Sequence, residues 1–317
     1  MALIRATDRP GDRQDLAAAL AAGPVVLDGG LATELERRGH DLSGVLWSAR
    51  LLRENPQAVV DTHLAYYAAG AQVATTASYQ VSEQGCLAAG FGAGEWAVML
   101  RRSVELARRA QAIADGTPTG RPDRPTWVAA SVGPYGAVLA DGSEYHGDYG
   151  LTVRELRAFH RPRLEVLAGA GADVLACETL PALAEVEAIC LELAALQVPA
   201  WVSLTVDGTR TRHGESLTEA YAMAGSVPSV VAVGLNCSEP GPAREAVELA
   251  AAASGKPVVV YPNSGETWDA GARTWAGEAR FEAGAVRSWI TAGARLVGGC
   301  CRVGPAAITE IREIAAR

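Results

Sequence analysis

Short apolar segments recur along the whole chain, and each is followed by a longer segment whose apolar residues are spaced three and four apart. The short segments are β-branched or alanine-rich and lack polar alternation, which is typical of parallel strands buried on both faces. We count eight predicted strands: Val25–Leu27, Gln72–Thr76, Thr126–Val132, Val174–Cys177, Ala200–Val206, Val230–Leu235, Val258–Tyr261 and Ala294–Val297.

The longer segments predict helices between and after these strands. Their ranges are Asn55–Ala69, Trp96–Ala114, Thr152–Leu167, Pro181–Leu196, Ser216–Ala224, Pro242–Ala253, Glu282–Thr291 and Pro305–Ala316. A strand followed by a helix, repeated eight times, predicts a single α/β domain, a (β/α)8 TIM barrel over residues 1–317. An open doubly wound sheet is the alternative, because the number of strands does not establish that a sheet closes.

Composition and charge restrict the class of protein. With 317 residues, 49% of them hydrophobic and 20% charged, the chain can form one large core. Its net charge of -8 argues against a nucleic-acid partner, which needs a basic surface. The N-terminal segment lacks the apolar stretch of a secretory signal, and no stretch approaches the roughly 18 uninterrupted apolar residues of a membrane span. We therefore expect a soluble, cytoplasmic protein without a membrane partner.

Polar residues gather where the predicted strands end, which is where barrel enzymes build their active sites. In chain order these ends carry Asp28, Thr76, Ser131, Glu178, Thr205, Asn236–Cys237, Asn263 and Cys300–Cys301. The strand interiors are apolar, so these residues are not scattered surface groups. The segment 133–150, after the third strand, adds three tyrosines, a histidine and three acids, as loops that line sites often do.

Three of the six cysteines lie at these strand ends, Cys237 after the sixth strand and Cys300–Cys301 after the eighth. Zinc prefers thiolate ligands, and a catalytic zinc site keeps one position open for substrate. Gly298 and Gly299 can relax the backbone enough for both neighbouring sulfurs to reach one ion. Spacing alone leaves open three small buried hydrophobic residues, or a disulfide between Cys300 and Cys301. The other cysteines are expected to be structural: Cys86, Cys177 and Cys190.

Seven segments distributed along the chain match one enzyme family. They are VVLDGGLATELERRG, TTASYQVS, SVGPYGAVLADGSEYHGDY, CETLP, VGLNCSEP, YPNSGETWD and GGCCRVGP. They resemble the homocysteine S-methyltransferases that use S-methylmethionine, over nearly the whole chain from Asp28 to Pro305. GxNC with a later GGCC is specific to the zinc-dependent class, and GPYGA, DGSEY and YPNSGE favour the sulfonium-using branch over the betaine-using one. The resemblance implies methyl transfer from S-methylmethionine, or from S-adenosylmethionine, to homocysteine, forming methionine.

The resemblance also implies a metal site. Cys237, Cys300 and Cys301 would hold Zn²⁺, and Asn263 would be the fourth zinc ligand until substrate displaces it. The thiol of homocysteine is mostly protonated at neutral pH, and binding to zinc would convert it to a nucleophile.

Three residues match the family's homocysteine-binding positions: Asp28, Gly29 and Glu178. The two carboxylates would hold the ammonium group, and the backbone at Gly29 can approach closely because glycine has no Cβ. Taken without the resemblance, Asp28 is also typical of a turn, and Glu178 of the first turn of a helix.

The donor carries a fixed positive charge on sulfur, which aromatic faces attract. Trp47 and Tyr79 are predicted to face this charge, and Glu144 and Tyr145 to meet the donor's amino-acid end. A core position for Trp47 and a solvated loop for Glu144 and Tyr145 are the alternatives.

Other functions remain compatible with the residues. Within the class, betaine or another compound can be the donor, and a selenol the acceptor. Outside it, a zinc-free barrel hydrolase would use Glu178 and Glu144 as an acid/base pair, and a noncatalytic protein would bind thiols or sense redox state. We expect no cobalamin or folate module, so the predicted partners are homocysteine and a sulfonium donor.

Overall fold

The computed structural model describes residues 15–42, 46–116, 124–269 and 274–317. At its centre lie eight parallel strands, each within three residues of its predicted bounds. They are β1 Val25–Val26, β2 Val73–Thr75, β3 Trp127–Val132, β4 Val174–Leu180, β5 Ala200–Leu204, β8 Val230–Asn236, β9 Val258–Tyr261 and β12 Ala294–Val297.

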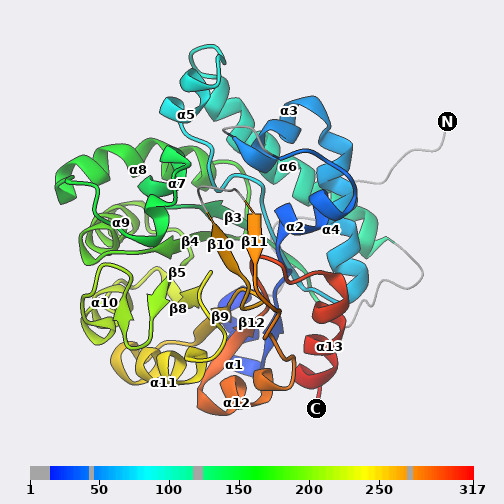
Figure 1. Cartoon of the computed structure of the whole chain (residues 1–317), viewed down its shortest axis with the longest axis vertical. Coiled ribbons are helices and arrows are strands. Elements are labelled where there is room, and N and C mark those ends of the chain that lie inside the picture. The colour runs from blue at the N-terminus through cyan, green and yellow to red at the C-terminus, as the bar shows by residue number, and fades with distance from the viewer. Residues whose placement is uncertain (1–14, 43–45, 117–123, 270–273) are drawn as a thin grey trace.

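The strands form a closed barrel. Their order is β1-β12-β9-β8-β5-β4-β3-β2, and a parallel bridge between Leu27 and Val73 joins the two ends of that order. The N–H of Asp28 donates to the carbonyl of Val73 across the same seam. The predicted barrel is therefore confirmed, and the open-sheet alternative is wrong (Figure 1).

Helices surround the barrel on its outside (Figure 1). The eight predicted helices are α4 Pro56–Ala69, α6 Glu95–Asp115, α8 Val153–Ala168, α9 Leu183–Leu196, α10 Leu217–Gly225, α11 Ala243–Ser254, α12 Ala285–Ala292 and α13 Pro305–Ala315. Only α9 and α12 begin two or more residues later than predicted, after Ala182 and Gly284 as their N-caps.

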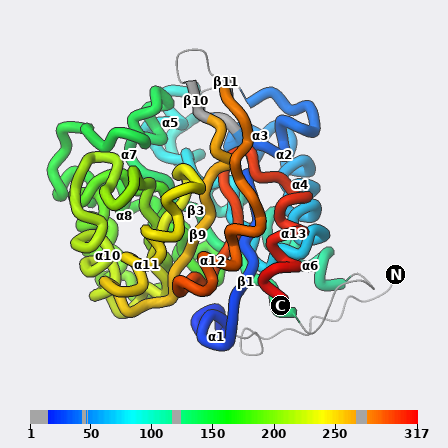
Figure 2. Tube along the Cα trace, turned by 60° about the horizontal axis from the view of Figure 1, so that its bottom comes forward, coloured from blue at the N-terminus to red at the C-terminus, as the bar shows by residue number. Residues whose placement is uncertain are grey.

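Short elements within the connections were not predicted, because each is too brief to show a hydrophobic period. They are α1 Leu16–Ala22, α2 Leu31–Arg37, η1 Trp47–Arg50, α3 Leu51–Glu54, α5 Glu83–Ala88, α7 Tyr135–Leu139, η2 Ser143–Tyr145, and the hairpins β6 Val206–Asp207 with β7 Arg210–Thr211 and β10 Thr267–Asp269 with β11 Thr274–Ala276. Figure 2 shows α1 at one end of the barrel and the β10–β11 hairpin at the other. Leu16 and Leu20 of α1 join the cluster of apolar residues inside the barrel, so this helix closes its N-terminal end.

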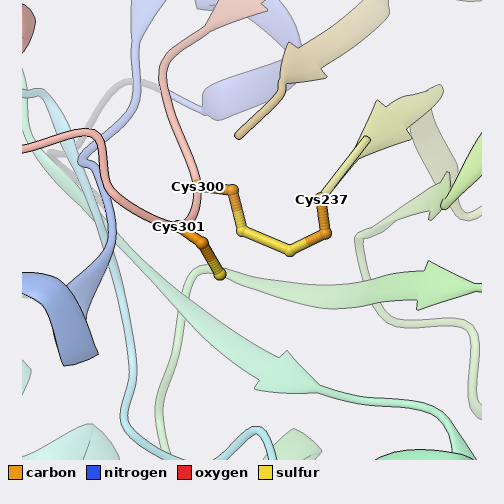
Figure 3. Close-up of side chains that lie close together, drawn as sticks. All are labelled: Cys237, Cys300 and Cys301. Atoms are coloured by element: carbon orange, nitrogen blue, oxygen red, sulfur yellow. A yellow bond between two sulfur atoms is a disulfide. The ribbon is translucent and has the colours of Figure 1, made fainter. Parts of the chain in front are cut away.

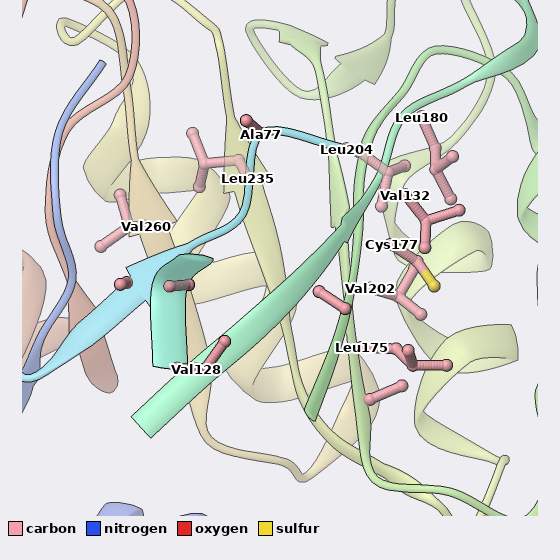
Figure 4. Packing of buried hydrophobic residues seen from close by; sticks show 14 of the residues in the cluster. Ala77, Val128, Val132, Leu175, Cys177, Leu180, Val202, Leu204, Leu235 and Val260 are labelled. Carbon is pink, nitrogen blue, oxygen red and sulfur yellow. The ribbon is translucent and has the colours of Figure 1, made fainter. Parts of the chain in front are cut away.

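Strand side chains alternate between the barrel interior and the helix layer, as their period of two requires. In β3, Trp127 and Ala129 belong to the interior cluster, whereas Val128 and Val132 pack in the outer one. Figure 4 shows part of this outer cluster, in which Cys177 lies among aliphatic side chains. Among the described helices, none is long and apolar enough to cross a membrane.

His63 on α4 makes stability depend on pH. It is fully buried, and within the described structure neither ring nitrogen has a hydrogen-bond partner. Burial lowers its pKa from 6.5 to about 4. The pKa of His63 is therefore lower in the folded than in the unfolded protein. The free energy of unfolding is highest above pH 6.5 and decreases as the pH falls from 6.5 towards 4.

This loss is expected to be about 3 kcal/mol between pH 7 and pH 4. The substitution His63→Leu removes the titrating group, so it should flatten this part of the pH dependence and cost little at pH 7. Urea unfolding of both proteins at pH 7, 5 and 4 measures the effect. Equal losses of stability on acidification in both proteins would contradict the assignment.

Candidate active site

The three strand-end cysteines converge. Cys237 follows β8, and Cys300 and Cys301 follow β12, with β9 between the two strands. Their three sulfur atoms all lie within 4.8 Å of one another. Figure 3 shows Cys237 and Cys300 joined by a disulfide, with the sulfur of Cys301 beside them. The disulfide weighed from the sequence, between Cys300 and Cys301, is therefore wrong in its pairing, because the chain directs Cys300 towards β8.

This donor set fits a thiophilic metal ion. Three sulfurs at this spacing can occupy three corners of a tetrahedron and leave the fourth for substrate. A metal needs the sulfurs of Cys237 and Cys300 as thiolates, so the disulfide and the metal-bound state exclude each other. The alternative of three small hydrophobic residues does not fit, since Cys300 and Cys301 are only half-buried and line a cavity.

The backbone holds the cysteines through contacts that only glycine permits. A Cβ on Gly298 would lie 2.6 Å from the Cβ of Leu27, and one on Gly299 would collide with Val303. β12 ends at Val297, so Cys300 and Cys301 lie beyond the regular strand and escape its alternation. The two glycines thus allow this segment to pack closely against Leu27 and Val303.

Asn263 lies directly beside the cysteine pair. Its side-chain oxygen accepts a hydrogen bond from the backbone N–H of Cys301 at 3.1 Å, and the backbone N–H of Asn263 donates to the carbonyl of Ser238. Asn263 therefore links the segments that carry Cys237 and Cys301. Its role as a fourth metal ligand stays a prediction.

Asp28 and Glu178 are buried carboxylates that line the same cavity as the cysteines. Asp28 accepts hydrogen bonds from the N–H of Thr75 at 2.7 Å and the hydroxyl of Thr75 at 2.9 Å. Burial raises the pKa of Asp28 to about 8, and the charge of Glu178 adds to the rise. A cation between the two carboxylates would reverse this effect.

Glu178 is held from two strands. It accepts hydrogen bonds from the hydroxyl of Ser131 and, at 2.8 Å, from that of Tyr261. Burial raises the pKa of Glu178, while these two hydrogen bonds act in the opposite direction. The hydrogen-bond donors to Asp28 and Glu178 are neutral, and neither carboxylate forms an ion pair with a described basic residue. A buried carboxylate without a cationic partner is suited to bind an ammonium group.

Strained backbone supports this end of the barrel. Thr179, next to Glu178, adopts a φ of 64°, and Cys237 a φ of 45°. The side chain of Asn236 pins Thr179, because its oxygen accepts the Thr179 N–H at 2.8 Å and its amide donates to the Thr179 hydroxyl at 2.7 Å. Positive φ at non-glycine residues costs free energy and is typical of functional sites.

The predicted donor residues reach the same cavity in part. Tyr79, Glu144 and Tyr145 line it together with the cysteines. Glu144 is buried, its Oε2 has no hydrogen-bond partner, and burial raises its pKa to about 7. The solvated-loop alternative for Glu144 is therefore wrong, because α7 and η2 fold the loop inward. Trp47 begins η1, and its side chain lies outside the described part.

One cavity of about 130 Å³ is thus lined by the three cysteines, by Asp28, Gly29 and Glu178, and by Tyr79, Glu144 and Tyr145 of the predicted donor residues. Sequence reasoning missed Thr75 and Tyr261, which hydrogen-bond to the carboxylates, and Thr179, which follows Glu178 with a positive φ. Tyr261 precedes the PNSG segment at the end of a predicted strand, and that position was the available signal. Gly29 also lines the cavity, and a Cβ there would lie 2.9 Å from the ring of Tyr66 and collide with the carbonyl of Val303.

Comparison with known proteins identifies the family. The family model described as homocysteine S-methyltransferase matches residues 25–315. The chain belongs to the homocysteine S-methyltransferase family. A homocysteine S-methyltransferase of Escherichia coli (strain K12) is 45% identical over 308 residues, covering 95% of this chain and 96% of that protein. A selenocysteine Se-methyltransferase of Brassica oleracea var. italica is 42% identical, covering 92% of this chain and 88% of that protein.

Solved structures of a family member agree. The homocysteine methyltransferase MmuM of Escherichia coli in its metallated form has a TM-score of 0.81 and 43% identity, covering 92% of this chain and 96% of that chain. The oxidized form of MmuM also has a TM-score of 0.81, with 44% identity, and the match covers 92% of this chain and 95% of that chain. Because the chain belongs to the homocysteine S-methyltransferase family, the barrel-hydrolase and noncatalytic alternatives are wrong.

Proposed function

We propose that this protein transfers a methyl group from a sulfonium donor to the thiol of homocysteine, using a zinc ion held by Cys237, Cys300 and Cys301. The convergence of the three sulfurs in the cavity that Asp28 and Glu178 also line carries the proposal. Zinc bound there supplies a Lewis acid that lowers the pKa of the homocysteine thiol.

Asp28 and Glu178 would bind the ammonium group of homocysteine and orient its thiol towards the cysteines. Thr75 and Tyr261 fix these carboxylates, so they need no rearrangement on binding. The thiol loses its proton to solvent, and its sulfur attacks the methyl carbon of the donor. A new carbon–sulfur bond forms, the donor's bond breaks, and its electron pair leaves with a neutral thioether. This leaving group needs no general acid.

The donor would lie on the side of the cavity formed by Tyr79, Glu144 and Tyr145. Aromatic faces of Tyr79 and Trp47 would stabilise the sulfonium charge, and the unpartnered oxygen of Glu144 would accept the donor's ammonium group. Betaine instead has a carboxylate close to its cationic centre. Tyr79, Glu144 and Tyr145 offer no positive charge to bind a carboxylate at that position.

Methionine formation from homocysteine tests this proposal, with zinc content measured on the same sample. We expect turnover with S-methylmethionine, less with S-adenosylmethionine and essentially none with betaine. Betaine outperforming both sulfonium compounds would overturn the donor assignment. Absence of methyl transfer from every donor by a zinc-loaded sample would overturn the function.

A selenol acceptor is the second candidate, favoured by the 42% identity to a selenocysteine Se-methyltransferase. Homocysteine and selenocysteine differ in the length of the chain that links the ammonium group to the reacting atom. Competition between the two acceptors in one assay separates them, and we expect homocysteine to be methylated faster.

A further inference from the structure

A second cavity, of about 420 Å³, lies at the same end of the barrel, where segments that follow β5 and β8 meet. Its walls are the β6–β7 hairpin that follows β5, the loop after β8, and Arg280. The lining residues are Val206, Asp207, Gly208, Arg212, Glu239, Pro240, Gly241, Pro242 and Arg280. It contains no residue that the sequence analysis singled out.

Hydrogen bonds fix this hairpin to the active site. The Thr205 hydroxyl donates to the carbonyl of Cys237 at 3.1 Å, and the Val206 N–H donates to the hydroxyl of Ser238 at 2.8 Å. On the other side, the N–H of His213 donates to the carbonyl of Pro181, three residues after Glu178. The hairpin is therefore held between the segments that carry Cys237 and Glu178.

The two arginines of the cavity differ in how their charges are satisfied. Arg280 pairs with Glu239 at 3.2 Å and donates to the carbonyl of Gly265. Arg212 has neither an ion pair nor a hydrogen bond within the described chain, and its Nε is buried. A buried guanidinium N–H without an acceptor is costly, so this arrangement is typical of a site for an anionic ligand.

Arg212 lines the second cavity, on the hairpin that is held between the segments that carry Cys237 and Glu178. Burial raises the pKa of the Tyr145 phenol well above its usual value, and the positive charge of Arg212 opposes that rise. Tyr145 lines the first cavity next to Glu144, whose free Oε2 is available to a cation. A carboxylate that can accept a cation thus lines the first cavity, and a guanidinium that can bind an anion lines the second.

We propose that Arg212 binds the carboxylate of the methyl donor's amino-acid portion, so that the donor extends from the cysteine cavity past Tyr145 into the second cavity. The inference rests on the proposed function and names the substrate class of the same site. An α-amino acid carries an ammonium and a carboxylate on one carbon, and Glu144 and Arg212 supply the complementary pair. Arginine can bind a carboxylate through two parallel hydrogen bonds, which fixes orientation as well as affinity.

The experiment compares three sulfonium donors that differ in these groups. S-methylmethionine carries ammonium and carboxylate, dimethylsulfoniopropionate carries the carboxylate alone, and trimethylsulfonium carries neither. We expect Arg212→Gln to lower kcat/KM about 10- to 100-fold for the two carboxylate donors. Trimethylsulfonium turnover and the KM for homocysteine should be unchanged, and Arg212→Lys should recover part of the loss.

Arg210→Gln is the matched control, because Arg210 lies on the same hairpin, is exposed and donates only to the carbonyl of Gly214 in the described chain. It should behave as the unsubstituted protein with all three donors. Equal losses for the three donors in Arg212→Gln, or no loss for any, would overturn the inference.

Calorimetric titration of S-methylmethionine separates this inference from the proposed function. Failure of the unsubstituted protein to methylate homocysteine with any of the donors would contradict the function alone. The dissociation constant for S-methylmethionine should still rise about 10- to 100-fold in Arg212→Gln. An unchanged constant would overturn the carboxylate site, whatever the activity.

Discussion

Replacing Cys300 by serine is expected to remove bound zinc and, with it, methyl transfer. The reduced protein should carry about one zinc per chain, because three thiolates share one tetrahedral ion. Substitutions around a metal's ligands typically cost 10- to 100-fold, so loss of a ligand should cost more than about 100-fold in activity. Elemental analysis and methionine formation on one sample measure both quantities.

The three cysteines allow a sharper test than activity alone. Cys237→Ser and Cys301→Ser should lose zinc as Cys300→Ser does. After oxidation, however, Cys301→Ser should keep the Cys237–Cys300 disulfide, which the other two variants cannot form. Thiol counting under denaturing conditions distinguishes them. Full zinc content and activity after Cys300→Ser would refute the metal site.

Cys190 provides the control. It is buried on α9 in the hydrophobic cluster outside the barrel and does not belong to the group of three converging cysteines. Cys190→Ala should leave zinc content and turnover nearly unchanged.

Replacing Glu178 by glutamine is expected to raise the KM for homocysteine about 10- to 150-fold, the value of a charge-assisted hydrogen bond to an ammonium group. Glutamine keeps the shape of glutamate and removes its charge, so zinc content should not change. Steady-state kinetics with homocysteine varied at saturating donor measures the effect. An unchanged KM would remove Glu178 from the homocysteine site.

Two further variants strengthen this test. Glu187→Gln changes an exposed acid on α9 and should leave the KM as it is. Asp28→Asn should weaken homocysteine as Glu178→Gln does. Since both carboxylates would contact one ammonium group, the two effects should not multiply in the double variant. Multiplying effects would place the two acids at separate groups.

The sequence by itself determined the strands, the main helices and the end of the barrel that carries the site. Strand and helix periodicities are local properties, and eight units repeated in order leave few architectures. Cys237, Cys300 and Cys301 could be grouped because parallel strands bring their C-terminal ends to one edge. The motifs around Asp28, Glu178 and Asn263 gave the family resemblance, which the family match confirmed.

Only the tertiary structure decided what depends on contacts between distant segments. Closure of the barrel rests on the bridge from Leu27 to Val73, which no periodicity encodes. The pairing of Cys237 with Cys300 depends on how the chain beyond β12 packs, and the burial of Glu144 on how its loop folds. Arg212 lies in an ordinary polar hairpin in sequence. It becomes a candidate binding residue because hydrogen bonds carry that hairpin to the active site and leave its guanidinium without a partner among the described residues.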